Sequence, residues 1–428
     1  MIKTVKNSIA LKGTITVPGD KSISHRSVML GALSKGTTNV TGFLTGEDCL
    51  STVDCFRKMG VEIEIDGTNV TIHGKGLRGL KKPEETLDVG NSGTTIRLIS
   101  GILSAQNFET NLTGDSSIQK RPMDRVSIPL SLMGAEIKGT DKNGKLFAPL
   151  TINGKSLNAI DYKLPVASAQ VKSAIILASL FAKGITTIIE PEPTRDHTEI
   201  MLNYLGADIK KEGNTIICNP VEELYGKNID VPADISSAAF FIALGLICPG
   251  SEITITNVGI NPTRTGIIDV FRQMGGNIIL SNEKENAGEK TADITVKTSA
   301  LRGITFGGDI IPRLIDEIPV IAVAACFAEG KTIIKDAQEL KVKETNRIKT
   351  VVEELSKMGA IIEETEDGMI ITGTGKLKGA STESHNDHRI AMSCAVAGIM
   401  AEGETTINDS QCVDISFPGF FDLLESLK

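Results

Sequence analysis

The stretch GDKSISHRS, Gly19–Ser27, holds a lysine, an arginine, a histidine and three serines directly before an apolar run. That run, VMLGAL, is typical of a buried helix, so the polar residues lie where the helix begins. A helix N-terminus offers unpaired backbone N–H groups and a partial positive charge, and it binds anions. Lys21 and Arg26 add two cations at the same place. The stretch is therefore typical of a phosphate or carboxylate site.

Five further apolar helices are preceded by polar stretches, namely GNSGTTIR, VASAQVKS, PADISSAA, PRLIDEIP and NDHRIAMS. The other cations in these stretches or in nearby loops are Arg97, Arg121, Lys172, Arg195, Lys343, Arg347 and Arg389. Arginine is the preferred partner of carboxylate and phosphate, because its planar fork matches them. The recurrence of such helix starts in one chain favours anion binding.

Taken singly, these stretches have ordinary structural interpretations. Lys21 and Arg26 are as consistent with surface cations as with a binding site. GNSGTT taken alone is best interpreted as a helix cap, since Asn, Ser and Thr are favoured there. It lacks the GK[ST] of a phosphate-binding P-loop and the spacing of GxGxxG.

Four other polar residues are also open to a structural interpretation. Asp316 and Glu317 could be N-terminal helix charges. His25 and His388 are interpreted as hydrogen-bonded structural histidines rather than ligands.

Two recurring phrases predict the elements that position these residues. The first is a helix end, a glycine and an alternating strand, as in FRKMGVEIEI from Phe56 and LNYLGADIK from Leu202. Glycine suits the left-handed position after a helix, and the alternation suits a half-buried strand. The second phrase is an Ala-rich apolar helix, a glycine and a strand rich in Thr and Ile, as in AIILASLFAKGITTIIE.

The phrases combine into six units of about 70 residues, a length that suits a βαβ-type subdomain better than a solenoid repeat. Their first helices are expected to begin near positions 20, 91, 168, 234, 316 and 387. Each unit has one nearly all-apolar, buried helix and one more charged surface helix. We expect an α/β fold with two domains of three units and a hinge at DVPADISS, Asp230–Ser237.

Two segments lie outside this pattern. The strand ALKGTITVPG precedes the first helix, and we expect it to pack with the C-terminal domain. NEKENAGEKTAD, 282–293, is predicted to be a polar, exposed hairpin loop.

The composition excludes several classes of protein. The chain has 428 residues, 40% hydrophobic and 23% charged, and a net charge of −8, which argues against nucleic-acid and membrane-surface partners. MIKTVKNSIALKG is too polar for a signal peptide, and no apolar run approaches the length of a membrane span. The seven cysteines are scattered without a CxxC pair, which suits a reducing cytoplasm. No Cys/His set has zinc-site spacing, so we expect no metal.

Together, PGDKSISHR, GNSGTTIRL, QKRPMDRV, ASAQVKSA, PRLIDEIPVIAV, KVKETNRI and NDHRIAM closely resemble the motifs of the 5-enolpyruvylshikimate-3-phosphate synthase (3-phosphoshikimate 1-carboxyvinyltransferase) family. Each motif is weak alone, but their order and spacing from about residue 5 to the C-terminus are highly specific. The resemblance implies a two-domain inside-out α/β barrel of six βαβαββ-type units, with buried helices pointing at the interdomain cleft. The implied domains are 20–231 and 1–19 with 232–428, with hinges near 17–20 and 230–236.

The resemblance also implies the reaction. The enolpyruvyl group of phosphoenolpyruvate moves to the 5-hydroxyl of shikimate 3-phosphate and phosphate is released, on the shikimate pathway to chorismate and the aromatic amino acids. It implies no cofactor and no covalent nucleophile. We expect a cytoplasmic monomer whose partners are these two small molecules, with no nucleic acid and no membrane.

The resemblance assigns residues to each substrate. The residues matching the shikimate 3-phosphate site are Lys21, Ser22, Arg26, Ser168, Gln170, Asp316 and Lys343. Those matching the phosphoenolpyruvate site are Lys21, Asn91, Gly93, Thr94, Arg121, Gln170, Arg347 and Arg389. Asp316 resembles the base at the 5-hydroxyl, and Glu344 and Lys21 are the candidates for proton delivery to the methylene carbon. Arg97 is expected to support the Asn91 loop without touching substrate.

Three positions depart from the enterobacterial pattern of the family. A serine pair is Ser168–Ala169 here, an asparagine is Glu339, and a C-terminal lysine is Ile415. We expect Arg195 or another cation to replace the phosphate contact of that lysine. Gly93 is glycine rather than alanine, so the space that the herbicide glyphosate uses is expected to be open.

Two other functions are alternatives to this one. The UDP-N-acetylglucosamine enolpyruvyl transferases share the implied fold, but they carry a different first motif and a reactive loop cysteine. A non-catalytic anion-binding or scaffold protein is the alternative from another class. Asp316 and Glu344 argue against it, because two carboxylates would repel an anionic ligand.

Overall fold

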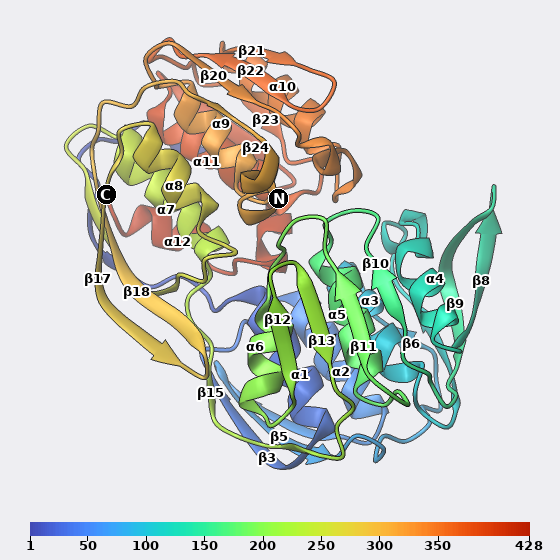
Figure 1. Ribbon diagram of the computed structural model, residues 1–428. Helices are drawn as coiled ribbons and strands as arrows, with labels where there is room; N and C mark the ends of the chain where they lie inside the picture. Colours follow the sequence, from blue (N-terminus) through green and yellow to red (C-terminus); the bar gives the residue numbers. More distant parts are fainter. The chain divides into compact units, whose positions relative to one another are not determined.

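The computed structural model describes residues 1–428, and the chain divides into two compact units (Figure 1). Unit 1 comprises Met1–Pro18, Pro232–Glu285 and Lys290–Lys428, and unit 2 comprises Gly19–Val231 and Asn286–Glu289. Each unit holds three mixed sheets. None of the helices combines the length and the apolar character that a membrane crossing requires.

The three sheets of unit 2 repeat one pattern, in which a parallel pair is extended by two antiparallel neighbours. The first sheet runs β6 (Leu87–Asp88), β7 (Glu109–Thr113), β9 (Lys145–Asn153), β8 (Glu136–Lys142). The second runs β10 (Asp161–Lys163), β11 (Thr186–Ile189), β13 (Thr215–Cys218), β12 (Ile209–Glu212). The third contains β3 (Ser34–Thr41), β5 (Asn69–Lys75) and β4 (Glu62–Asp66), with β14 (Leu224–Tyr225) and β15 (Ile229–Asp230) parallel to β3.

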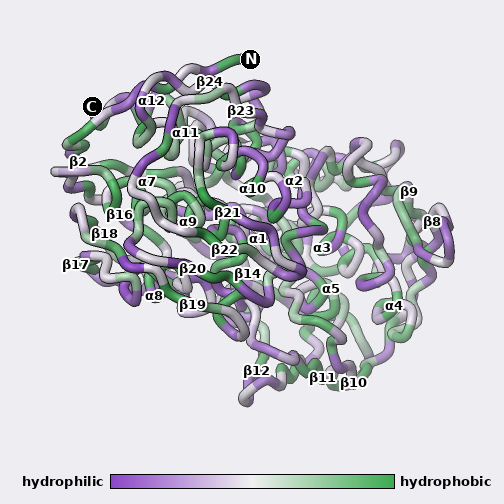
Figure 2. Tube along the Cα trace, turned by 90° about the horizontal axis from the view of Figure 1, so that it is seen from above, coloured by the Kyte–Doolittle hydropathy of each residue, from purple (hydrophilic) through white to green (hydrophobic).

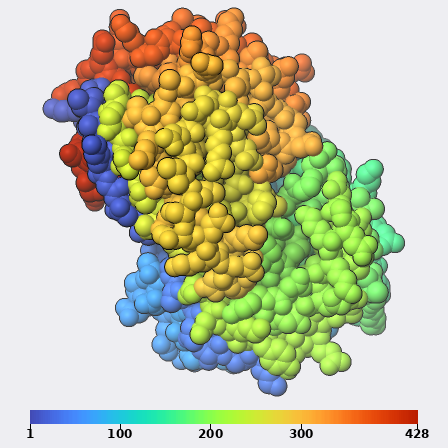
Figure 3. All heavy atoms as spheres, turned by 60° about the vertical axis from the view of Figure 1, so that its left-hand side comes forward, coloured from blue at the N-terminus to red at the C-terminus, as the bar shows by residue number.

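Unit 1 repeats the pattern with the N-terminal strands included, except that its third sheet has three strands and a single antiparallel neighbour. One sheet runs β17 (Asn277–Asn286), β18 (Glu289–Lys297), β16 (Glu252–Gly259), β2 (Lys12–Ile15), and another runs β19 (Thr305–Phe306), β20 (Lys331–Ile334), β22 (Met369–Thr372), β21 (Ile361–Glu364). The third runs β1 (Lys3–Lys6), β24 (Glu404–Asn408), β23 (Ser381–Glu383). The first strands therefore pack with C-terminal ones, as predicted, and Figure 3 shows blue N-terminal atoms beside red C-terminal ones.

A long apolar helix leads into the central parallel strand of each sheet. In unit 2 these helices are α1 (Lys21–Leu33), α3 (Gly93–Leu103) and α5 (Ala169–Ser179). In unit 1 they are α7 (Ile235–Ile247), α9 (Ile318–Ala325) and α11 (His388–Met400). All six predicted starts are confirmed to within two residues. The three helices of a unit pack on one another and fill its hydrophobic core, which can be followed in Figure 2. At Gly101 in α3, a Cβ would lie 2.2 Å from the carbonyl oxygen of Ala174 in α5, so only glycine permits this approach.

Further helices and turns complete each unit. The second helices are α2 (Glu47–Lys58), α4 (Asp124–Leu132), α6 (His197–Tyr204), α8 (Gly266–Gln273), α10 (Arg347–Lys357) and α12 (Phe420–Glu425). The 3-10 turns are η1 (Ile118–Lys120), η2 (Gly308–Arg313), η3 (Gln338–Val342) and η4 (Ser410–Ile415). Gly134 after α4 and Gly206 after α6 have φ of 106° and 109°, in the left-handed region predicted for these stops.

The predicted hairpin at 282–293 is confirmed, and residues 282–285 are exposed, but the prediction of an exposed loop throughout this stretch is wrong. β17 and β18 run through this stretch and meet in a turn at Ala287 and Gly288, and Glu289 and Thr291 are buried. The turn Asn286–Glu289 belongs to unit 2, whereas the strands leading to it belong to unit 1. The polar residues mislead because their partners are remote in sequence: Asn286 donates to Asp230, and Glu289 pairs with a histidine of α6.

Candidate active site

Five of the six buried helices begin with a side chain that caps the backbone. The capping residues are Asp20, Ser92, Ser168, Asp234 and Asp387, on α1, α3, α5, α7 and α11. Each accepts a hydrogen bond from an N–H of the first turn, at 2.8 to 3.4 Å. The cap satisfies one of the donors that a helix start leaves open and holds the preceding loop in place. The cap interpretation of GNSGTT is thus correct, with Ser92 as the cap.

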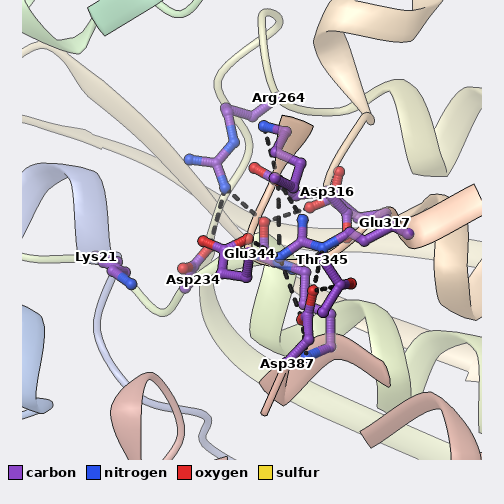
Figure 4. Close-up of polar contacts among 12 residues, drawn as sticks. Lys21, Asp234, Arg264, Asp316, Glu317, Glu344, Thr345 and Asp387 are labelled. Carbon is purple, nitrogen blue, oxygen red and sulfur yellow. Dashed lines mark hydrogen bonds and ion pairs between the residues drawn. The ribbon is translucent and has the colours of Figure 1, made fainter. Parts of the chain in front are cut away.

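In unit 1 a charged group, here called the Asp316 cluster, surrounds one buried arginine (Figure 4). Its members are Asp316, Lys343, Glu344, Arg347, Asp387 and Arg389. Arg347 is 1% exposed and contacts three carboxylates. Its Nη1 lies 3.1 Å from Asp316 Oδ1, its Nη2 lies 2.5 Å from Glu344 Oε2, and its Nε lies 2.8 Å from Asp387 Oδ2.

Arg347 and Asp387 hold each other ionised. Burial alone would lower the pKa of Arg347, but the carboxylates of Asp387, Glu344 and Asp316 outweigh it and raise that pKa. Burial likewise acts to raise the pKa of Asp387, yet the guanidinium of Arg347 outweighs burial and holds it below its ordinary value. Asp387 also accepts from the hydroxyl of Thr345 at 3.1 Å. The arginine and its deepest carboxylate therefore form a fixed pair that orients the others.

Asp316 and Glu344 are the members of the cluster best placed to meet a ligand. Their side chains are 12% and 27% exposed, whereas Asp387 is fully buried. Lys343 Nζ lies 3.4 Å from Asp316 Oδ1, and Arg389 Nη1 donates to the Asp316 carbonyl oxygen at 3.2 Å. A partly exposed carboxylate among fixed cations is suited to proton transfer and to holding hydroxyl groups.

A second polar group lies beside this cluster at the starts of α7 and α9 (Figure 4). The hydroxyl of Ser236 donates to the buried carboxylate of Glu317. Arg264 donates to Ser236 at 2.8 Å and to Asp234 at 3.1 Å. These bonds fix the two helix starts to each other, and Asp316 directly precedes Glu317 in the chain.

In unit 2 the loop before α3 forms a second polar group, here called the Gly93 cluster. Its members are Asn91, Gly93, Thr94, Arg97, Arg121 and Gln170. Arg121 donates to the Asn91 side chain at 3.0 Å, and Gln170 donates to Thr94 at 3.0 Å. Arg97 donates to the side-chain oxygen of Gln170. The structure thus gathers all the unit 2 residues assigned to phosphoenolpyruvate except Lys21, and Arg97 joins them through Gln170.

The start of α1 holds the two cations of the GDKSISHR motif. Lys21 forms an ion pair with Asp48 of α2. Arg26 is 4% exposed; its Nε donates to Thr198 at 2.7 Å, Nη1 to the Ser22 carbonyl at 2.9 Å, and Nη2 to Ser173 at 2.9 Å. Burial lowers the pKa of Arg26 to about 10, so it remains charged at neutral pH. These bonds use three of the five N–H groups of a guanidinium and leave two for a ligand.

Lys172 was expected among the anion-binding cations, and this expectation is wrong. Its side chain is fully buried, with Nζ 2.7 Å from Glu199 Oε1 and 3.1 Å from Glu190 Oε1. Burial acts to lower the pKa of Lys172, but the two carboxylates outweigh burial and raise it. The lysine charge is therefore neutralised inside unit 2. Its position at a helix start resembled a binding site because the acidic partners lie 18 and 27 residues away in sequence.

The histidines fit the structural interpretation or stay untested. His25 is buried with Nδ1 2.7 Å from the hydroxyl of Thr52, and burial together with Lys21 and Arg26 holds its pKa well below the ordinary value.

Two groups have metal-ligand geometry, Glu62 with Glu64 and His73, and Glu353 with Glu354 and His385. In the second group Glu354 already accepts from Lys357, His385 and a backbone N–H.

Sequence reasoning missed four residues that hold the assigned ones. Asp387 had a signal, because an aspartate directly before an apolar helix is a favoured cap. No sequence pattern marks the other three, Asp48, Ser173 and Thr198, because they contact Lys21 and Arg26 only through tertiary packing.

Comparison with known proteins identifies the family. Residues 5–424 match the family model described as EPSP synthase (3-phosphoshikimate 1-carboxyvinyltransferase). The chain is 61% identical over 423 residues to 3-phosphoshikimate 1-carboxyvinyltransferase of Thermoanaerobacter pseudethanolicus, covering 99% of both chains. It is 57% identical over 426 residues to the enzyme of that name from Bacillus cereus, covering 100% of this chain and 98% of the relative. The solved structure of EPSP synthase from Acinetobacter baumannii superposes with a TM-score of 0.90 at 50% identity, covering 100% of this chain and 98% of that one. The chain belongs to the EPSP synthase family.

Proposed function

We propose that this protein transfers the enolpyruvyl group of phosphoenolpyruvate to the 5-hydroxyl of shikimate 3-phosphate, releasing phosphate. The observation that carries the proposal is the Asp316 cluster, in which one buried arginine orients two partly exposed carboxylates beside two further cations. A protein that only bound anions would gain nothing from Asp316 and Glu344, since they repel the ligand. An enzyme needs them to move protons.

The residues proposed to bind shikimate 3-phosphate are Lys21, Ser22, Arg26, Ser168, Gln170, Asp316 and Lys343. Several of these already contact one another within their own unit. Arg26 holds the Ser22 carbonyl, Ser168 caps α5 one residue before Ala169, and Lys343 lies beside Asp316. These contacts support the proposal because they hold the donors in place before the ligand arrives.

The residues proposed to bind phosphoenolpyruvate are Lys21, Asn91, Gly93, Thr94, Arg121, Gln170, Arg347 and Arg389. The Gly93 cluster supports this assignment, since it places a guanidinium beside the N-terminus of α3. An arginine fork and a helix N-terminus both favour a phosphate or carboxylate group.

The chemistry follows from these roles. The Asp316 carboxylate takes the proton of the 5-hydroxyl while that oxygen bonds to C2 of phosphoenolpyruvate. Glu344 in its protonated form, or the Lys21 ammonium, delivers a proton to C3, which gives a tetrahedral adduct. Loss of a proton from C3 and cleavage of the bond between C2 and the phosphate oxygen then release phosphate and restore the double bond. The cations offset the charge that the two anionic substrates bring together.

The finer architecture is part of the proposal. We propose the domains 20–231 and 1–19 with 232–428, with hinges near 17–20 and 230–236; the division of the chain into compact units after Pro18 and after Val231 supports them. Three helices packed inside three sheets support an inside-out α/β barrel in each domain. We also propose a cytoplasmic monomer; the seven cysteines are all buried free thiols, which fits a reducing compartment.

Phosphate release tests the function. Purified protein is mixed with shikimate 3-phosphate and phosphoenolpyruvate, and each substrate is then omitted in turn. We expect release only when both are present. UDP-N-acetylglucosamine in place of shikimate 3-phosphate is the matched control and should give none. Release with the UDP-sugar, or with phosphoenolpyruvate alone, would contradict the proposal.

A further inference from the structure

The turn of the β17–β18 hairpin, Asn286–Glu289, belongs to unit 2 and contacts the rest of that unit at two points. The Asn286 side chain donates to Asp230, which also accepts from Thr41, so the turn is tied to β15 and β3. Glu289 Oε1 lies 2.6 Å from Nδ1 of His197, and both residues are almost fully buried. A Cβ at Gly288 would lie 2.8 Å from Cγ2 of Ile200, so the turn backbone lies directly against α6.

The first turn of α6 joins this contact to Arg26. His197 is the first residue of the helix, and the next residue, Thr198, accepts from Arg26 Nε at 2.7 Å. The hydroxyls of Thr198 and Ser173 lie 2.7 Å apart, and Ser173 accepts from Arg26 Nη2 at 2.9 Å. The guanidinium is thus held on two sides by a buried pair of hydroxyls. The carboxylates of Glu199 and Glu289 also act to keep Arg26 charged, against the effect of burial.

We infer that Thr198 and Ser173 are positioning residues for Arg26, and that Glu289 acts through His197 to hold α6 in the place where they do so. The inference rests on the proposed role of Arg26 at shikimate 3-phosphate. According to this inference, neither of the two hydroxyls contacts the substrate. They fix the plane of the guanidinium, so that its two remaining N–H groups face one direction. This arrangement affects the binding of shikimate 3-phosphate and leaves unchanged the Gly93 cluster, whose residues are proposed to bind phosphoenolpyruvate.

Variants of Thr198 test the inference directly. Thr198→Val keeps the shape of the side chain and removes its hydroxyl. Because a hydrogen bond to a charged group is lost, we expect the Kd of shikimate 3-phosphate, measured by titration calorimetry, to rise about tenfold. The KM of phosphoenolpyruvate should stay within about twofold, since neither Thr198 nor Arg26 is among the residues proposed to bind it. Thr198→Ser restores the hydroxyl and should restore the Kd. Thr110→Val is the matched control, because Thr110 is a buried threonine of unit 2 whose hydroxyl has no hydrogen-bond partner.

A second variant, Glu289→Ala, tests the remote end of the chain of contacts. It should raise the same Kd severalfold, with the KM of phosphoenolpyruvate again unchanged. An unchanged Kd in both Thr198→Val and Glu289→Ala would overturn the inference. So would an equal rise in both KM values, or a failure of Thr198→Ser to rescue, because either marks a general structural role. A wild-type protein that binds no shikimate 3-phosphate would instead refute the proposed function.

Discussion

Arg347 is the cation around which the charged residues of unit 1 are arranged. Its contacts with Asp316, Glu344 and Asp387 set one positive charge against three negative ones in a buried place. Lys343 and Arg389 lie near Asp316 and reduce that imbalance. Two anionic substrates that enter here would meet carboxylates as well as cations, so the carboxylates weaken the binding of those substrates. That weaker binding is consistent with a catalytic role, and it makes Asp316 the residue to change first.

Asp316→Asn should separate binding from turnover. The amide keeps the size of the side chain but cannot take the proton of the 5-hydroxyl, so kcat should fall by roughly 10²–10⁴. Shikimate 3-phosphate should still bind in a calorimetric titration. Asp309→Asn in η2 is the control, because Asp309 is an exposed aspartate outside the cluster. A kcat within tenfold of the wild type would exclude Asp316 as the base.

Gly93 belongs to the cluster proposed to bind phosphoenolpyruvate, and its lack of a side chain is expected to leave the space that glyphosate uses open. A Cβ at this position would lie 2.9 Å from Nη1 of Arg121 and 3.2 Å from Nη1 of Arg97. Both atoms are ends of flexible side chains, so Gly93→Ala should fold and displace Arg121 by a few tenths of an ångström. We expect glyphosate to inhibit the wild type in a phosphate-release assay. The variant should show weaker inhibition and a higher KM for phosphoenolpyruvate, with the KM of shikimate 3-phosphate unchanged as internal control. Normal wild-type turnover at millimolar glyphosate would refute the first expectation.

At the scale of elements, the starts of the buried helices were predictable and their remote partners were not. Apolar runs preceded by Asp or Ser locate a helix start, because capping and burial are both local in sequence. Gly134 and Gly206 mark helix ends for the same reason. The predictions for Lys172 and for the exposure of the hairpin turn failed, because their partners come near them only after folding. Those partners are Glu190 and Glu199 for Lys172, and His197 for the turn. Local patterns show which residues are unusual, and packing decides whether a cation faces a ligand or a carboxylate.

The ion group of Lys172 predicts how α5 and α6 are held together. Lys172→Met would leave two buried carboxylates without their cation, so the free energy of unfolding should fall by about 3–5 kcal/mol. Denaturant unfolding measures the loss, with the exposed Lys210→Met as control. Adding Glu190→Gln and Glu199→Gln should recover much of it; no recovery would contradict the ion-group interpretation.

The same group has a defined pH dependence. The folded pKa of Lys172 is raised, so its contribution to stability is complete below the ordinary lysine value of 10.5 and is lost as pH rises through the folded pKa. The contribution of Lys172 to the free energy of unfolding of the wild type should therefore be constant near neutral pH and be lost only at strongly alkaline pH, as denaturant unfolding at increasing pH would show.

At the scale of the whole molecule, the chain passes between the two units at four places, and each unit has its own hydrophobic core. Separate cores allow the units to differ in stability, so a ligand need not stabilise both equally. Most of the residues proposed for shikimate 3-phosphate belong to unit 2, including Lys21, Arg26 and Gln170.

Shikimate 3-phosphate should therefore stabilise unit 2 in particular. At a concentration of 100 times Kd, the free energy of unfolding of the binding unit should rise by about 2.7 kcal/mol, since ligand binds the folded state alone. Scanning calorimetry with and without ligand measures the shift in the unfolding midpoint. Shikimate without its phosphate, at the same concentration, should give a smaller shift, and so should Arg26→Ala with the full ligand. If the midpoint stays constant while titration shows the site occupied, the ligand does not bind preferentially to the folded unit, and the assignment of Lys21, Arg26 and Gln170 to it is wrong.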